Sequence, residues 1–199
     1  MAISTYAELQ TAMATWLDRT LSSATDCIAL FEAQVNRRLT VRPQTTTATI
    51  TMSSGAGTLP TDYLSWKRVT WQGTPKRNLE YVTPEYLAAS NPTDASADPT
   101  RFTIEGETIK VGPISNTSLV MLYSQKVPAL TVSATTNWLL TAHPDAYLFG
   151  SLTMAATLTS DAENGRAWNA LTQGILGELW GLDFNQRGPM AMRTTGPTP

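Results

Sequence analysis

The chain has 199 residues, of which 42% are hydrophobic and only 15% are charged, and its formal net charge is −2. This length suits one domain, or one domain with an insertion, and supports a hydrophobic core without disulfides or metals. The near-neutral charge excludes a global field that would recruit nucleic acid or an anionic membrane. The single cysteine excludes an internal disulfide. A fraction of charged residues as low as 15% is typical either of a loop-rich domain with threonine-rich strands or of a surface that is largely interface.

Residues 1–44 predict an N-terminal helical hairpin. Thr5 and Glu8 form a capping-box signature, which starts a helix directly after Thr5. A second helix is predicted over about 24–39, where apolar side chains recur at helical spacing. Pro43 ends it, because the residue before a proline is pushed out of the α region.

Residues 45–136 predict a β-rich insertion in the form of a small antiparallel sheet or half-barrel. Gly106 indicates a tight hairpin, Pro84 starts a short helix, and the glycine-rich segment 53–57 is interpreted as a turn. Strands are predicted over 45–52, 64–71, 78–82, 101–105, 108–111 and 118–126.

Residues 137–184 predict a return to helix. Pro144 suits the first turn of a third helix, and Ser160 with Glu163 forms a capping-box signature for a fourth. Gly174 and Gly177 lie inside this fourth helix, where each costs about 1 kcal/mol relative to alanine. We interpret both glycines as positions of close helix packing.

The predicted fold is α+β: a four-helix bundle with an inserted antiparallel β-rich subdomain and an extended C-terminal arm. Residues 5–40 and 144–183 are expected to supply the two helix pairs of the bundle. The arm covers residues 185–199, which contain three prolines and two glycines and too little apolar surface to become ordered without a partner. A disordered end is the alternative interpretation.

The sequence predicts no catalytic residue, no cofactor and no metal, and therefore no enzyme. His143 is the only histidine and is expected to cap or flank the third helix, while Cys27 is expected to be a buried structural thiol. Phosphate-binding, dinucleotide, zinc and serine-hydrolase motifs are missing. Glu105 and Glu107 flank a turn and could bind a cation, although turns expose such residues routinely.

A basic patch is one candidate contact surface. Arg37, Arg38 and Arg42 form the densest group of positive charges in the chain. They are either a solvated helix end, where the helix macrodipole favours cations, or a contact with the acids of a neighbouring subunit.

A tryptophan pair is the second candidate. Trp66 and Trp71 lie on a predicted strand beside Lys67 and Arg68. Aromatic residues among basic ones are able to stack on nucleic acid, but the acidic overall balance favours sheet packing or a subunit interface.

Six segments in order resemble adaptor proteins found in the necks of tailed bacteriophages. They are TYAELQ at 5–10, FEAQVNRRL at 31–39, LPTDYL at 59–64, LEYVTPE at 79–85, FTIEG at 102–106, and NWLL with HPDAYL between 137 and 148. Their spacing covers nearly the whole chain.

The resemblance implies a non-enzymatic homo-oligomer, a dodecameric ring beneath the portal that links it to tail or nozzle proteins. It also implies DNA that passes through the ring without sequence-specific binding, and extended termini that reach partners. We therefore expect a virion neck protein that is made in the host bacterial cytoplasm. No apolar run approaches the roughly 20 residues of a membrane span, so no membrane contact is expected.

On this resemblance, the arm is expected to fasten the adaptor to the portal. Met190 and Met192 would point the same way in an extended strand and suit an apolar pocket. Arg187 and Arg193 would pair with acidic groups, and a fully extended arm would reach on the order of 50 Å.

Two other functional classes stay open. The main alternative is a nucleic-acid-binding module acting in packaging or DNA transit, because DNA passes through such a ring. A small hydrolase is disfavoured by the scarcity of nucleophiles and ligands described above.

Overall fold

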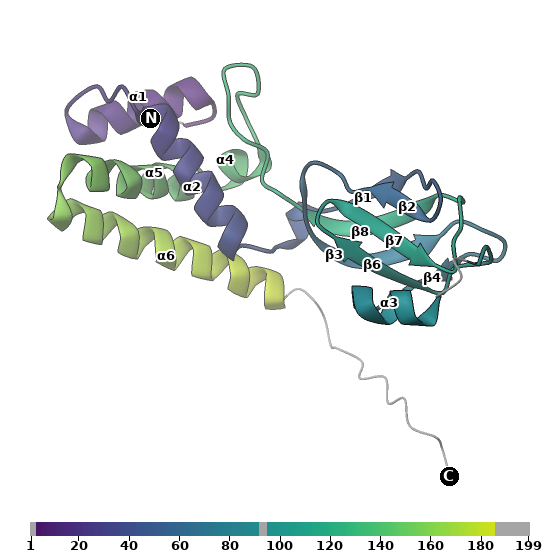
Figure 1. Ribbon diagram of the computed structural model, residues 1–199. Coiled ribbons are helices and arrows are strands. Elements are labelled where there is room, and N and C mark those ends of the chain that lie inside the picture. The colour runs from purple at the N-terminus through teal and green to yellow at the C-terminus, as the bar shows by residue number, and fades with distance from the viewer. Residues whose placement is uncertain (1–2, 92–94, 186–199) are drawn as a thin grey trace, which may run out of the picture. The chain divides into compact units, whose positions relative to one another are not determined.

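In a computed structural model of the protein, which describes residues 3–91 and 95–185, the chain separates into two compact units (Figure 1). The described residues within 1–42 and 127–185 form the helical unit, and those within 43–126 form the β unit. Within the described residues, no helix is long and apolar enough to cross a membrane.

The helical unit contains five helices among its described residues. They are α1 (Tyr6–Leu17), α2 (Ala24–Arg38), α4 (Trp138–Ala142), α5 (Pro144–Thr159) and α6 (Ala162–Asn185). The predicted capping box is confirmed: the Thr5 hydroxyl accepts the Glu8 N–H, and the Glu8 carboxylate accepts the Thr5 N–H at 3.0 Å. The short helix α4 is an addition to the sequence prediction, which placed only two helices after residue 137.

The predicted four-helix bundle is wrong, although the α+β class is correct. Instead of two helix pairs packing face to face, α1, α2, α4 and α6 all pack on α5, and α1 touches α2 only slightly. The physical reason lies in α5, whose buried side chains include Ala146, Tyr147, Leu148, Leu152 and Ala155 and so point in many directions. A helix that is apolar all round is surrounded by its neighbours rather than carrying a single buried stripe.

A buried polar network holds the helical unit together. The Glu32 side chain on α2 accepts hydrogen bonds from the Leu130 N–H at 2.8 Å and from the Tyr147 hydroxyl at 3.0 Å. The Asn137 amide donates to the Tyr147 oxygen at 2.6 Å and to the Pro128 carbonyl at 2.7 Å. Burial raises the pKa of Glu32 above its ordinary value, and the Leu130 and Tyr147 donors oppose that rise.

Glycine permits close packing in α5 rather than in α6. Gly150 faces the buried Phe31 ring on α2 so closely that a methyl group there would overlap the ring. At Gly174 and Gly177 an added methyl group would meet no described atom within 4 Å. Our interpretation of the two α6 glycines as sites of close packing therefore does not hold within the described chain.

The start of α6 also differs from the prediction. Ser160 does not cap α6; it ends α5 in the left-handed conformation, with φ of 56°. Asp161 takes the capping role instead, because its carboxylate accepts the Asn164 N–H at 3.2 Å and the Asn164 side-chain amide at 2.7 Å.

The described part of the β unit forms two four-stranded sheets. The strand order is β1-β8-β3-β4 in the first sheet and β2-β7-β6-β5 in the second. The first sheet contains β1 (Thr45–Ile50), β3 (Tyr63–Trp71), β4 (Arg77–Asn78) and β8 (Leu119–Gln125), and the second contains β2 (Ala56–Thr58), β5 (Glu80–Tyr81), β6 (Arg101–Glu105) and β7 (Thr108–Gly112). Both sheets contribute to one hydrophobic core that includes Val69, Phe102, Ile109, Leu119 and Met121.

The prediction of a small antiparallel sheet or half-barrel is wrong, because the described residues form two sheets and one strand pair is parallel. The predicted strand 78–82 is divided, because β4 pairs with the first sheet while β5 pairs with the second. Strand β5 is parallel to β6, and helix α3 (Pro84–Ser90) lies between them in the sequence. Parallel neighbours need such a crossover connection, which the short helix supplies.

Two turns shape the second sheet. The β6–β7 hairpin around Gly106, with φ of 59°, confirms the sequence prediction. The segment 53–57, predicted as a turn, contains a two-residue turn in which Ser54 and Gly55 both have positive φ, at 49° and 73°. This primed turn geometry joins strands tightly, and β2 follows it directly.

The buried network predicts that removing the Tyr147 hydroxyl lowers the stability of the protein. Tyr147→Phe should lower the free energy of unfolding by about 1–3 kcal/mol, because Glu32 and Asn137 each lose a partner inside the protein. The loss should shrink as the pH falls, because protonated Glu32 no longer needs a donor. Urea unfolding at several pH values measures both effects. Tyr6→Phe is the control, since Tyr6 is also buried, at 5% exposure against 0% for Tyr147, and its hydroxyl has no hydrogen bond among the described residues. Equal stability of the two variants would contradict the role of the network.

Replacing a helix glycine by alanine should change the stability in opposite directions at Gly150 and at Gly174. Gly150→Ala should destabilise the protein by about 1–3 kcal/mol, because the new methyl group overlaps the enclosed Phe31 ring. Gly174→Ala should stabilise it by roughly 0.5–1 kcal/mol, because alanine favours helix and space is available. Thermal unfolding of the two variants tests both signs, and a stabilising Gly150→Ala would refute the proposed packing.

Candidate interaction surfaces

A groove of about 760 Å³ opens in the helical unit. It lies between the C-terminal half of α2, the end of α5 and the start of α6, and its apolar lining includes Met154, Ala156 and Ala162. Gly165 allows α6 to approach α5 here, because an added methyl group would stand only 3.0 Å from the Ala156 side chain. The groove is therefore a product of how the three helices pack.

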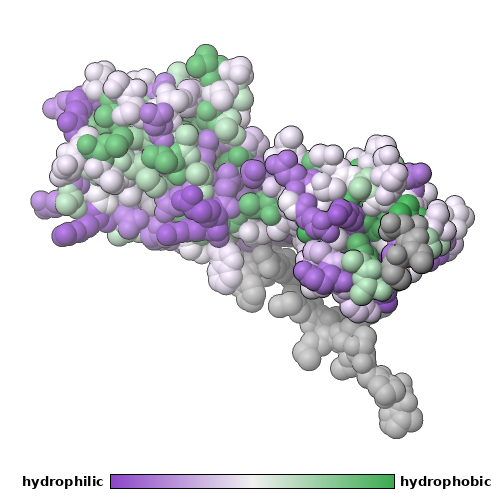
Figure 2. All heavy atoms as spheres, in the orientation of Figure 1, coloured by the Kyte–Doolittle hydropathy of each residue, from purple (hydrophilic) through white to green (hydrophobic). Residues whose placement is uncertain are grey.

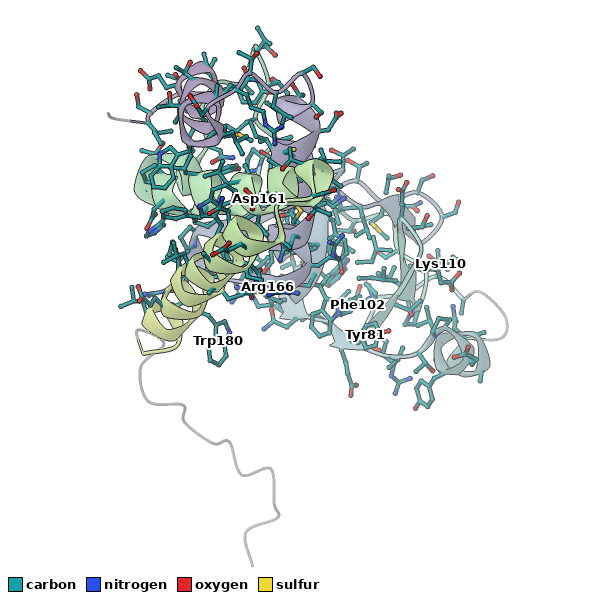
Figure 3. All side chains as sticks on the ribbon, turned by 90° about the vertical axis from the view of Figure 1, so that its left-hand side faces the viewer. Tyr81, Phe102, Lys110, Asp161, Arg166 and Trp180 are labelled. Carbon is teal, nitrogen blue, oxygen red and sulfur yellow. The ribbon has the colours of Figure 1, made fainter. Side chains whose placement is uncertain are left out.

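The groove carries an excess of positive charge. Arg37 and Arg38 come from α2 and Arg166 from α6, whereas Asp161 is the only acid among the described residues of the lining. Figure 3 shows Asp161 and Arg166 at the beginning of α6. The Arg38 guanidinium donates to the Gln173 side chain at 2.8 Å, and no ion pair to any of the three arginines is present among the described residues. These cations therefore retain capacity to bind carboxylates or phosphates.

The β unit has an aromatic patch, which we define as Trp66, Tyr81, Tyr86, Phe102 and Arg101. Trp66 and Tyr81 are 39% and 42% exposed and stack with ring centroids 5.4 Å apart. Both rings pack edge-on against buried Phe102, and Figure 3 shows Tyr81 beside it. The Arg101 guanidinium lies over the Tyr86 ring at 5.1 Å.

Backbone pairing fixes the position of this patch. The parallel pairing of β5 with β6 places Tyr81 opposite Phe102, and β3 supplies Trp66. A hollow of about 440 Å³ adjoins the patch and includes Glu80, Tyr81 and Arg101 in its lining. Exposed stacked rings with a cation and an acid nearby suit a protein partner, because aromatic residues and arginine are enriched at protein interfaces.

The three arginines of the predicted basic patch separate into two groups. Arg37 and Arg38 line the groove. Arg42 instead binds an acid of its own chain: its Nε lies 3.3 Å from the Asp183 carboxylate, which also accepts the Arg42 backbone N–H at 2.8 Å. Asp183 is almost fully buried, so Arg42 compensates a charge inside the helical unit.

The predicted tryptophan pair also separates. Trp66 is exposed, whereas Trp71 is buried at 5% exposure in the core of the β unit. The Trp71 indole N–H lies 3.3 Å from the Ser115 hydroxyl, and Arg77 lies over the ring at 5.2 Å. A subunit contact at this pair therefore rests on Trp66. The predicted arm residues, Arg187, Met190, Met192 and Arg193, lie outside the described residues.

Sequence reasoning missed Arg166 and Tyr86 as surface residues of interest. Arg166 belongs to the groove only because α6 packs on α5, and no local pattern links it to Arg37. Tyr86 follows the predicted helix start at Pro84, but only the fold places Arg101 over its ring.

Cys27 and His143, the residues considered for catalysis or ligand binding, lie in ordinary structural positions. Cys27 is fully buried, and burial raises the pKa of its thiol, with a smaller contribution from Asp26. His143 occupies the position before α5, but its side chain makes no capping hydrogen bond. In the described part of the chain, no three His, Cys, Asp or Glu residues gather as a metal site.

One protein-family model matches nearly the whole chain. The model is described as SU10 adaptor protein, and the match runs over residues 4–197. A comparison with curated proteins gave no match. The family match agrees with the resemblance drawn from the six sequence segments and spans both the helical and the β unit. The chain therefore belongs to the SU10 adaptor protein family, a family of phage head–tail adaptors.

Proposed function

We propose that the protein forms a dodecameric ring beneath the portal, links the portal to the tail or nozzle proteins, and lets DNA pass through the ring. Family membership supports a structural role in the virion and contacts with other head and tail proteins. The ring, its position and the DNA passage are the proposed part. Within this proposal the protein acts through its surfaces rather than through a reaction centre.

The observation that carries the proposal is the exposure of large apolar side chains on the helical unit. Among the described residues of this unit, six such side chains are between 48% and 57% exposed, namely Trp16, Leu30, Leu158, Leu171, Trp180 and Leu182. In Figure 2, apolar side chains reach the surface of this unit in several separate areas. Single exposed apolar residues are ordinary, but their spread over α1, α2, α5 and α6 supports contacts with more than one neighbour, as a ring subunit needs.

The aromatic patch supports a protein contact more than a DNA contact. Glu80 and Glu85 are exposed on the same strand and helix that carry Tyr81 and Tyr86. Carboxylates at this position would repel a phosphate backbone, which supplies most of the affinity in non-specific DNA binding. We therefore keep DNA in the proposal as cargo that passes through the ring without being bound.

Stoichiometry on the portal tests the ring. Purified portal rings mixed with the protein should acquire one complete dodecameric adaptor ring each, as measured by native mass spectrometry. Assembly should be cooperative, because closure makes the contacts mutually reinforcing. Complexes that stop at one or two copies per portal would refute the ring. Strong, salt-dependent retention of the protein on DNA would favour a nucleic-acid-binding module instead.

Deletion of residues 185–199 tests the arm. The truncated protein should keep its circular dichroism spectrum but bind portal rings more weakly, because the proposed arm supplies contacts that the folded units lack. Met190→Ser with Met192→Ser should also weaken binding, whereas Thr194→Ser with Thr195→Ser is the matched control. Unchanged portal binding by the truncated protein would remove the arm from the proposal.

A further inference from the structure

The groove concentrates positive charge in a unit whose surface is otherwise acidic. Among the described residues of the helical unit there are five arginines; three line the groove, Arg42 pairs with Asp183, and Arg19 remains. Outside the groove, the exposed acids of the same described residues are Glu8, Asp18, Asp26, Asp145, Glu163 and Glu178. Two copies of this unit are therefore complementary when the groove of one meets an acidic surface of the other, and repulsive when groove meets groove.

Helix α2 presents an acidic surface with a matching apolar part. Asp26, Leu30, Ala33 and Arg37 follow one another at spacings of four, three and four residues, so they share one face of the helix. All four are exposed, and Leu30 is 53% exposed. This stripe starts with a carboxylate, continues with an apolar middle, and ends in the groove at Arg37.

We propose that the groove of one copy receives the Asp26–Leu30 end of α2 from a second copy. This inference rests on the proposed ring and names the contact that closes it. The Asp26 carboxylate lies against the guanidinium groups of the groove, and Leu30 packs on the apolar lining near Met154. The second copy thus supplies a carboxylate and, one helical turn away, an exposed leucine. The groove supplies three arginines and an apolar lining.

The contact joins two different surfaces of the helical unit, the groove and the Asp26 end of α2. A two-fold dimer would set two α2 helices antiparallel, so that the Asp26 end of each copy meets the groove of the other, and assembly would stop at two copies. A head-to-tail contact leaves one free groove and one free Asp26 end on each growing assembly, and repetition generates a ring when the rotation closes. The proposed contact is the head-to-tail one, and a complex of two copies that assembles no further would contradict it.

A charge swap tests the contact. Asp26→Lys and Arg166→Asp should each weaken assembly of the adaptor ring on the portal by about tenfold, because each places like charges together. The double variant should recover most of the loss, because it restores opposite charges with the signs exchanged. Native mass spectrometry against adaptor concentration gives the midpoint of ring assembly for each protein.

Matched controls separate the contact from general effects of charge. Thr25→Lys adds a positive charge in the same first turn of α2 but off the stripe, and Arg19→Asp reverses an exposed arginine outside the groove. Both controls should assemble like the unaltered protein. Thermal unfolding checks that every variant is folded.

The outcomes distinguish this contact from the ring itself. If the unaltered protein stops at one or two copies per portal, the proposed ring fails and the contact with it. If the unaltered protein forms full rings and both single variants do so at the same midpoint, only the groove contact is overturned. A double variant no better than the single variants would also overturn it. Loss of DNA retention in Arg166→Asp with normal ring assembly would assign the groove to phosphate instead.

Discussion

The helical unit depends on a buried carboxylate that joins two distant parts of the chain. Glu32 on α2 and Tyr147 on α5 are 115 residues apart in sequence, and the whole β unit lies between them. Burying a carboxylate is costly unless donors compensate it, and here the Leu130 N–H and the Tyr147 hydroxyl do so. The network thereby fixes the chain where it returns from the β unit, and it sets α5 against α2. The Gly150–Phe31 approach completes that packing, and the groove forms along the same helices.

The groove and the aromatic patch each result from the packing of helices or strands within one unit. The groove exists because α6 turns back along α5 and brings Arg166 to the same hollow as Arg37 and Arg38. The aromatic patch exists because the chain leaves one sheet after β4 and enters the other at β5, which carries Tyr81 to Trp66 and Phe102. A structural protein of the virion has to meet several partners, and these two surfaces offer different chemistry, one basic and the other aromatic.

Local signals in the sequence predicted much of the secondary structure. The capping box at Thr5 and Glu8, the extent of α2 and the hairpin at Gly106 were all predicted correctly, because each depends on neighbours within a few residues. The start of α6 was predicted one residue early, because Ser160 and Asp161 both precede a helix and only the left-handed conformation of Ser160 decides between them. The strand at 78–82 was predicted as one element, because alternation of side chains does not reveal which sheet receives each end.

The sequence by itself determined the α+β class, the location of most helices and strands, and, through six ordered segments, the adaptor family. Only the tertiary structure decided that the helices gather around α5 instead of forming a four-helix bundle, since periodicity describes one face of a helix and not the number of its neighbours. It also decided which charged and aromatic residues are available to partners. Arg42 and Arg37 look alike in sequence, yet one neutralises buried Asp183 and the other lines an open groove. Trp66 and Trp71 share a strand, yet one is exposed and the other lies in the core, because burial depends on what the rest of the chain places over each side chain.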